Sequence, residues 1–125
     1  MPARWPACVA TGLATPNTVA AHAIYLSDAE FEAWPDHGIA IAHCPASNLK
    51  IEARTLPLAR LVGRVPIGLG TDWTVTNNSM DLLAEARLAA LVGKMRADDP
   101  HGAAGAPDGA HADASTARAC SASTG

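Results

Sequence analysis

Short apolar runs alternate with more polar, amphipathic stretches between Val19 and Met95 of this 125-residue chain. Three runs are almost entirely apolar and are bounded by turn-forming residues; they cover residues 19–24, 38–43 and 65–72. Runs of this length and composition are typical of strands that are buried on both faces of a parallel sheet. The pattern therefore predicts three such strands.

The stretches that follow each run carry helix signals. Ser27 and Glu30 have the spacing of a capping box, which predicts a helix that Pro35 ends early. A short helix is expected over residues 56–62, behind a possible cap at Thr55. The last helix is expected from Met80 to Met95, with an apolar stripe that we expect to be buried. The stripe consists of Met80, Leu83, Ala84, Leu88, Leu91, Val92 and Met95.

This order of strands and helices predicts an α/β fold with a parallel sheet. The flanking segments look different. Residues 1–18 hold three prolines and no sustained periodicity, so we expect an irregular lead-in. Residues 96–125 are rich in Ala, Gly, Ser, Thr and Asp and offer little apolar surface to offset the entropy of ordering. We expect this tail to be disordered and residues 19–95 to form the ordered unit.

Composition narrows the class of function. The net charge of −3 gives no basic field, so neither nucleic acid nor an anionic membrane is an expected partner. No apolar run reaches the ~18 residues of a membrane span. The three cysteines are odd in number and widely spaced, which favours a reducing cytoplasm over a disulfide framework.

Three polar residues fall at or near the ends of the predicted strands: His22, His43 and Asp72. In parallel α/β folds the reacting groups gather at the carboxyl ends of strands. A carboxylate with nearby imidazoles suits metal-assisted hydrolysis. The structural alternative stays open, since a lone His in an apolar strand is most often a core residue and an Asp after a strand most often forms a turn or a cap.

Several short motifs of the sequence resemble those of one known group of enzymes. Ala21-His22-Ala-Ile-Tyr-Leu-Ser-Asp, His43-Cys-Pro-Ala-Ser-Asn-Leu-Lys, Gly68-Leu-Gly-Thr-Asp and Asn77-Asn-Ser-Met-Asp-Leu-Leu-Ala-Glu follow in this order. The series resembles the methylthioadenosine/S-adenosylhomocysteine deaminases and the related chlorohydrolases of the amidohydrolase superfamily. The resemblance covers the ordered unit.

The resemblance implies a metal-dependent (β/α)₈ barrel whose sixth, seventh and eighth strands are the three described above. It implies that His22 is a catalytic histidine and that Asp72 both ligates the metal and shuttles a proton. His43 and Asn48 would contribute to substrate binding. The implied reaction is hydrolytic deamination of an amino-heterocycle such as an adenosine derivative, with zinc or another divalent metal as cofactor.

Departures from the family pattern lead us to expect that the chain is a fragment, inactive alone. A complete barrel needs ~250 residues, and this chain has 125. The His-x-His pair of the first strand and the fifth-strand His with its Glu are absent, so we expect no firm metal binding. Trp73 replaces a family Gly, and we expect it to crowd the metal position.

Three interpretations follow. The chain is a truncated or frameshifted hydrolase, a non-enzymatic α/β remnant that serves as a binding module, or one half of a split enzyme that needs a complementing chain or an oligomer. The frameshift hypothesis comes from residues 115–125. One permitted back-translation of this segment, read two bases later, gives Asp-Gly-Ala-Arg-Leu-Leu-Gly-Ile-Asp, which resembles the family.

Overall fold

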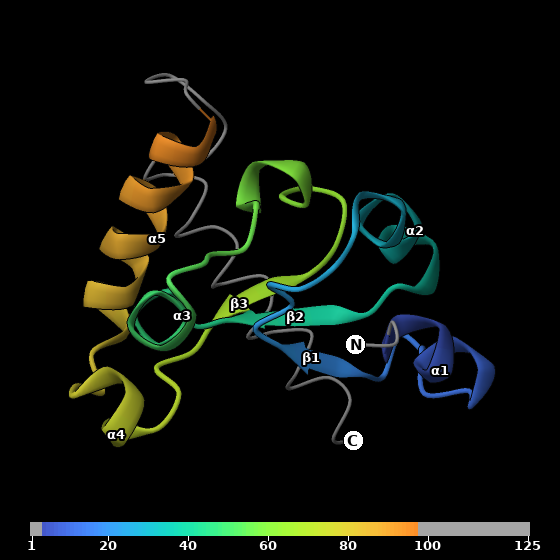
Figure 1. The fold of residues 1–125 in the computed structure, drawn as a ribbon, viewed down its shortest axis with the longest axis horizontal. Helices are drawn as coiled ribbons and strands as arrows, with labels where there is room; N and C mark the ends of the chain where they lie inside the picture. The colour runs from blue at the N-terminus through green and yellow to red at the C-terminus, as the bar shows by residue number, and fades with distance from the viewer. Residues whose placement is uncertain (1–3, 98–125) are drawn as a thin grey trace.

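A three-stranded parallel sheet forms the centre of the protein. The computed structural model describes residues 4–97. Strands β1 (Val19–Ala21), β2 (Ala40–His43) and β3 (Ile67–Leu69) lie side by side in that order, with β2 in the middle (Figure 1). Both strand pairs are parallel. The prediction of an α/β fold with a parallel sheet is therefore confirmed.

The strands are shorter than the apolar runs that predicted them. β1 ends at Ala21 because the next two residues, His22 and Ala23, have φ values of 69° and 49°. These left-handed conformations take the chain out of the extended region. β3 likewise ends before Asp72, whose φ is 56°. The apolar runs thus include the residues that turn the chain at the rim of the sheet.

Helix α2 (Asp28–His37) begins at the predicted capping box. Ser27 Oγ accepts a hydrogen bond from Glu30 N at 3.4 Å, and Ser27 N donates to Glu30 Oε2 at 2.7 Å. The expected early end at Pro35 is wrong. Pro35 removes one backbone donor, yet the helix continues to His37 and is capped by Gly38. Gly38 has φ 66° and donates its N–H to Pro35 O at 3.2 Å.

Helix α1 (Arg4–Ala10) lies in the segment that we expected to be irregular. Trp5 stacks on Trp34 of α2, with ring centroids 4.5 Å apart. Figure 1 shows α1 beside α2 at the amino-terminal end of β1. This tertiary contact, rather than an amphipathic pattern, stabilises the helix. The sequence therefore carries no periodic signal that could have predicted it.

Two further helices, α3 (Pro45–Glu52) and α4 (Thr74–Asn77), were not expected. Helix α3 follows β2 directly, and its first residue is a proline, which suits the first helical position because no N–H is needed there. Helix α4 is one short turn after β3. The helix expected over 56–62 is only the 3₁₀ turn η1 (Leu58–Arg60). Pro57 explains the difference, because it disfavours helical backbone at the preceding residue.

Helix α5 (Leu82–Ala97) differs from the expectation in its buried face. Asp81 Oδ1 accepts hydrogen bonds from the N–H groups of Leu83 and Ala84, so the helix begins after Asp81. The buried residues are Glu85, Ala89, Val92 and Gly93. Most of the predicted stripe is exposed, and Leu83 is 82% exposed. The periodicity identified an apolar face but did not determine which face packs against α3, β3 and η1.

The main hydrophobic core lies between the sheet and the helices above it in Figure 1. Its buried members are Phe31, Trp34, Ile39, Ile41, Leu56, Leu61, Val65 and Ile67. Helices α2 and η1 lie on this face of the sheet, and α3 and α5 lie beyond the carboxyl ends of the strands. Val19 and Ala21 of β1 are exposed.

Two expectations concern the end of the chain. Helix α5 continues to Ala97, so the boundary expected after residue 95 falls inside it. The expected disorder of the tail and the frameshift hypothesis lie, from residue 98 on, outside the described residues. Within residues 4–97, no helix is long and apolar enough to cross a membrane.

Candidate active site

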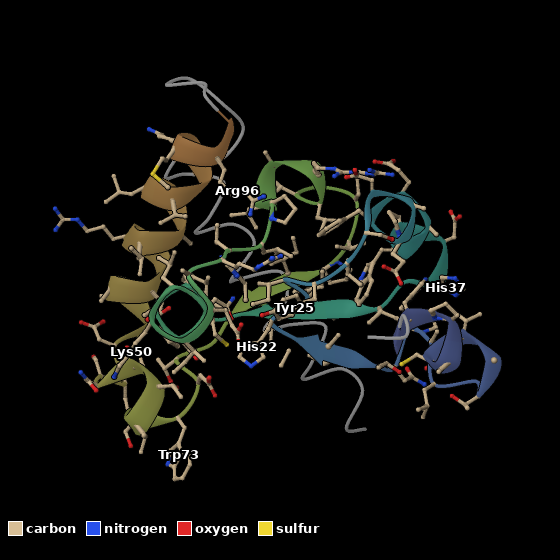
Figure 2. All side chains as sticks on the ribbon, viewed as in Figure 1. His22, Tyr25, His37, Lys50, Trp73 and Arg96 are labelled. Atoms are coloured by element: carbon tan, nitrogen blue, oxygen red, sulfur yellow. The ribbon has the colours of Figure 1, made fainter. Side chains whose placement is uncertain are left out.

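The side chains of His22 and Asp72 meet at the carboxyl-end rim of the sheet. His22 follows β1 and Asp72 follows the non-adjacent strand β3, yet His22 Nε2 lies 3.9 Å from Asp72 Oδ2. Both side chains are partly exposed. Figure 2 shows the His22 ring at the end of β1, on the side of the sheet away from η1. The structure thus brings together an imidazole and a carboxylate from separate strand–loop units.

Helix α3 holds both members of this pair through two consecutive residues. Ser47 Oγ donates a hydrogen bond to Asp72 Oδ2 at 2.5 Å. Asn48 Oδ1 lies 2.7 Å from His22 Nδ1. Ser47 and Asn48 are only 3% and 2% exposed, so both contacts are shielded from competing water. The first turns of α3 therefore fix the orientations of both the His22 imidazole and the Asp72 carboxylate.

The environment keeps Asp72 ionised. The hydrogen bond from Ser47 is the main cause that holds the pKa of Asp72 below its ordinary value, and the backbone N–H of Trp73, the Thr76 hydroxyl and the His22 imidazole act in the same direction. Thr76 Oγ1 donates to Asp72 Oδ2 at 3.1 Å. Asp72 is therefore a carboxylate at neutral pH, as a metal ligand or a proton acceptor must be.

His43 lies at the end of β2, buried beneath the rim. Burial, and secondarily the nearby His22, lower its pKa to about 4, so this imidazole is neutral at neutral pH. His43 Nδ1 and Asn48 Nδ2 are buried and have no hydrogen-bond partner among the described residues. The two residues expected to bind substrate are thus both close to His22 but lie below the surface of the described unit.

The described residues do not complete a metal site. Within residues 4–97 no group of three or more His, Cys, Asp or Glu side chains could hold a metal ion. A catalytic zinc site usually has three protein ligands, and the rim offers one carboxylate with an imidazole nearby. Trp73, expected to crowd this position, is 69% exposed, and its ring lies apart from His22 in Figure 2.

Sequence reasoning missed three residues that shape the rim: Ser47, Asn77 and Glu85. Glu85 of α5 is buried and accepts hydrogen bonds from Ala46 N and Asn77 Nδ2. Ser47 precedes Asn48 in the Pro-Ala-Ser-Asn motif, so this motif could have pointed to Ser47. Glu85 gave no such signal, because a carboxylate in an amphipathic helix is usually solvated.

Comparison with known proteins places these residues in a family context. A sequence profile described as "Amidohydrolase family" matches residues 7–110. The 5-methylthioadenosine/S-adenosylhomocysteine deaminase of Nitratidesulfovibrio vulgaris is 38% identical over 96 residues, covering 76% of this chain and 22% of the relative. The 5'-deoxyadenosine deaminase of Methanothermobacter thermautotrophicus is 38% identical over 90 residues, covering 71% of this chain and 21% of the relative. The chain therefore spans about a fifth of the length of these curated relatives.

Solved structures agree with this likeness. An adenosine deaminase from Xanthomonas campestris with bound zinc superposes with a TM-score of 0.74 at 30% identity, covering 89% of this chain and 27% of that one. The atrazine chlorohydrolase of Arthrobacter aurescens, complexed with zinc, superposes with a TM-score of 0.69 at 31% identity, covering 78% and 21%. Both matches extend over most of the described residues and over about a quarter of the larger proteins.

Proposed function

Because this chain belongs to the amidohydrolase family, we propose that it supplies one part of the active site of a hydrolytic deaminase that acts on an adenosine-type amino-heterocycle. The observation that carries the proposal is the approach of His22 Nε2 to Asp72 Oδ2 at 3.9 Å, with each side chain anchored by α3. The deaminase names of the relatives support the substrate class. The barrel architecture of strands six to eight is part of the same proposal.

The proposed roles follow from the hydrogen bonds. If His22 Nδ1 carries the hydrogen and donates to Asn48 Oδ1, then Nε2 keeps its lone pair. Nε2 and the Asp72 carboxylate, whose Oδ2 already accepts from Ser47 and Thr76, are then acceptors beside the same region. A water molecule held there would donate one hydrogen bond to His22 and lose its other proton to Asp72.

In the overall reaction, water attacks the ring carbon that bears the amino group, and ammonia leaves. The proton taken by Asp72 returns to the leaving nitrogen, so the carboxylate is regenerated. A divalent metal is proposed for the complete enzyme, as in the zinc-bound structures that resemble this chain. Asp72 would be one of its ligands. The described residues do not make a full ligand set, so no step is assigned to the metal.

His43 and Asn48 are proposed to act from below the substrate. Their buried positions favour support of His22 over broad contact with a ligand. Among the described residues, Nδ1 of His43 and Nδ2 of Asn48 have no partner, so both are proposed to bind a polar group that enters the rim. We also propose a small-molecule substrate as the partner, and a cytoplasmic setting supported by the free thiols of Cys8 and Cys44.

The proposal is tested by complementation in trans. The chain is co-expressed with the part of the Nitratidesulfovibrio vulgaris deaminase that precedes the matched segment, and ammonia release from 5-methylthioadenosine is measured with added zinc. We expect no release from either part alone and measurable release from the pair, lost in Asp72→Asn. A stable, well-folded complex without activity would contradict the proposal.

The second candidate function is a non-enzymatic binding module. The incomplete ligand set within residues 4–97 and the exposed apolar face of α5 favour it. Sequencing several hundred bases on each side of the coding region separates the candidates. A reading frame that encodes His-x-His and a strand with His and Glu supports the deaminase, and its absence from every frame supports the binding module.

A further inference from the structure

Glu85 is a buried carboxylate that the proposed reaction does not use. It lies on α5, is 2% exposed, and uses both of its oxygens. Oε2 accepts a hydrogen bond from the backbone N–H of Ala46 at 3.1 Å, and Oε1 accepts one from Asn77 Nδ2 at 2.8 Å. A buried carboxylate is costly unless it is hydrogen-bonded, so these two contacts must persist in the folded protein.

The two hydrogen bonds of Glu85 lead to the residues next to Ser47 and Asp72. Ala46 immediately precedes Ser47, the donor to Asp72. Asn77 Nδ2 also donates to the backbone oxygen of Thr71 at 2.6 Å, and Thr71 immediately precedes Asp72. One carboxylate therefore joins the start of α3 to the loop after β3. Lys50 of α3 also donates to Val75 O at 3.0 Å and to Asn78 Oδ1 at 2.9 Å, but these contacts are exposed and lie farther along both segments. Glu85 supplies the buried link next to Ser47 and Asp72.

We propose that Glu85 is a positioning residue, which holds the start of α3 and the loop after β3 in the register that brings Ser47 onto Asp72. The role assigned to Asp72 rests on the proposed function, but the register itself does not. Glu85 touches neither His22 nor Asp72. It acts through the backbone of Ala46 on one side and through Asn77 and Thr71 on the other.

Glu85→Gln tests this with little change in volume. The Gln side chain has one acceptor oxygen, so its NH₂ group must face either Ala46 N–H or the Asn77 NH₂ group, and one arm is lost. Asn77→Ala removes only the arm to Thr71 and serves as a second variant should Glu85→Gln fail to fold. Glu52→Gln, at the exposed carboxyl end of α3, is the matched control for loss of a carboxylate.

The readout is NMR of the full chain without substrate. We follow amide hydrogen exchange at Ala46 and the nuclear Overhauser effect between the β protons of Ser47 and Asp72. Glu85→Gln should lose the Ser47–Asp72 effect whichever arm is lost, whereas exchange of the His22 N–H, bonded to Ala42 O in the sheet, should stay within twofold. If the arm to Ala46 is the one lost, exchange of the Ala46 N–H should also become at least tenfold faster. Asn77→Ala should lose the Ser47–Asp72 effect with Ala46 still protected. Glu52→Gln should change neither.

Three results would overturn the proposal. One is a Ser47–Asp72 effect that persists in both variants. Another is equal acceleration of all protected amides, which indicates general destabilisation only. The third is the absence of protection from hydrogen exchange at the Ala46 amide in the unaltered chain. Because no substrate is used, these results count against Glu85 alone, whereas a failed complementation assay counts against the proposed function.

Discussion

His22 and Asp72 share a left-handed backbone conformation, with φ values of 69° and 56°, and their side chains meet at 3.9 Å. This conformation costs a residue other than glycine about 1–2 kcal/mol. Each residue stands where its strand ends, and the turn directs its side chain toward the other. The conformation persists because buried contacts from Ser47 and Asn48 hold the two side chains in place.

The first prediction compares Asp72→Asn with Asp72→Ala. Asparagine tolerates left-handed backbone and still offers an oxygen to Ser47, so the free energy of unfolding should change by less than about 0.5 kcal/mol. Alanine leaves the buried Ser47 hydroxyl unpaired and should lower it by about 1–3 kcal/mol. Urea unfolding followed by circular dichroism measures both. Equal effects of the two variants would mean that the Ser47 contact contributes nothing.

The second prediction concerns the charge of Asp72. Ser47→Ala should raise the pKa of Asp72, because the hydrogen bond from Ser47 is the main cause that lowers it. Thr76→Val should raise the same pKa less, since Thr76 is a lesser cause. The carboxyl ¹³C chemical shift of Asp72, followed against pH, gives both values. The order of the two effects would be reversed if Thr76 were the dominant donor.

The third prediction concerns acid sensitivity. The pKa of His43 falls from 6.5 to about 4 on folding, so between these pH values the unfolded chain binds a proton that the folded protein excludes. The free energy of unfolding should be highest above pH 6.5. It should decrease by about 3 kcal/mol as the pH falls from 6.5 to about 4.

His43→Gln should remove most of this pH dependence. His37→Gln, at the end of α2, is the control for loss of an imidazole. Urea unfolding at pH 7, 5.5 and 4.5 measures the slope for each protein. A slope in His43→Gln as steep as in the unaltered chain would show that other groups cause the acid sensitivity.

The fourth prediction compares two glycines with the same backbone conformation. Gly38 and Gly12 have φ values of 66° and 72°, so alanine is strained at both. A Cβ at position 38 would also lie 3.3 Å from Pro16 Cγ, whereas a Cβ at position 12 would meet nothing within 4 Å. Gly12→Ala should cost about 1–2 kcal/mol and Gly38→Ala more. Thermal unfolding of both variants measures the difference, which should vanish if Pro16 moves freely.

Several features were predictable from residues close together in the chain. The capping box at Ser27 and the presence of three parallel strands depend on local signals, and both are confirmed. Helix α3 was missed because its first residue, Pro45, looked like the end of a strand. The apolar stripe of α5 does not mark its packing face, because apolar periodicity does not distinguish a face that packs against the rest of the protein from one that faces outward.

In the candidate site, too, some residues were predictable from local sequence and others were not. His22, His43 and Asp72 were singled out because each falls at or near the end of a predicted strand, and the structure brings His22 and Asp72 together. The supporting contacts of Ser47 and Glu85 join α3 to the loop after β3 and α5 to α3. Their pairing depends on the three-dimensional arrangement of α3 and α5, which no local pattern of the sequence contains.

The most direct test of the central claim is a chimera assayed for deamination. The segment of the Nitratidesulfovibrio vulgaris deaminase that matches this chain over 96 residues is replaced by the corresponding residues of this chain, and ammonia release from 5-methylthioadenosine is followed. If His22 and Asp72 are site residues, the chimera is active, Asp72→Asn reduces kcat by a factor of at least about 10², and Glu52→Gln leaves it unchanged. A folded chimera in which Asp72→Asn retains full activity would contradict the account.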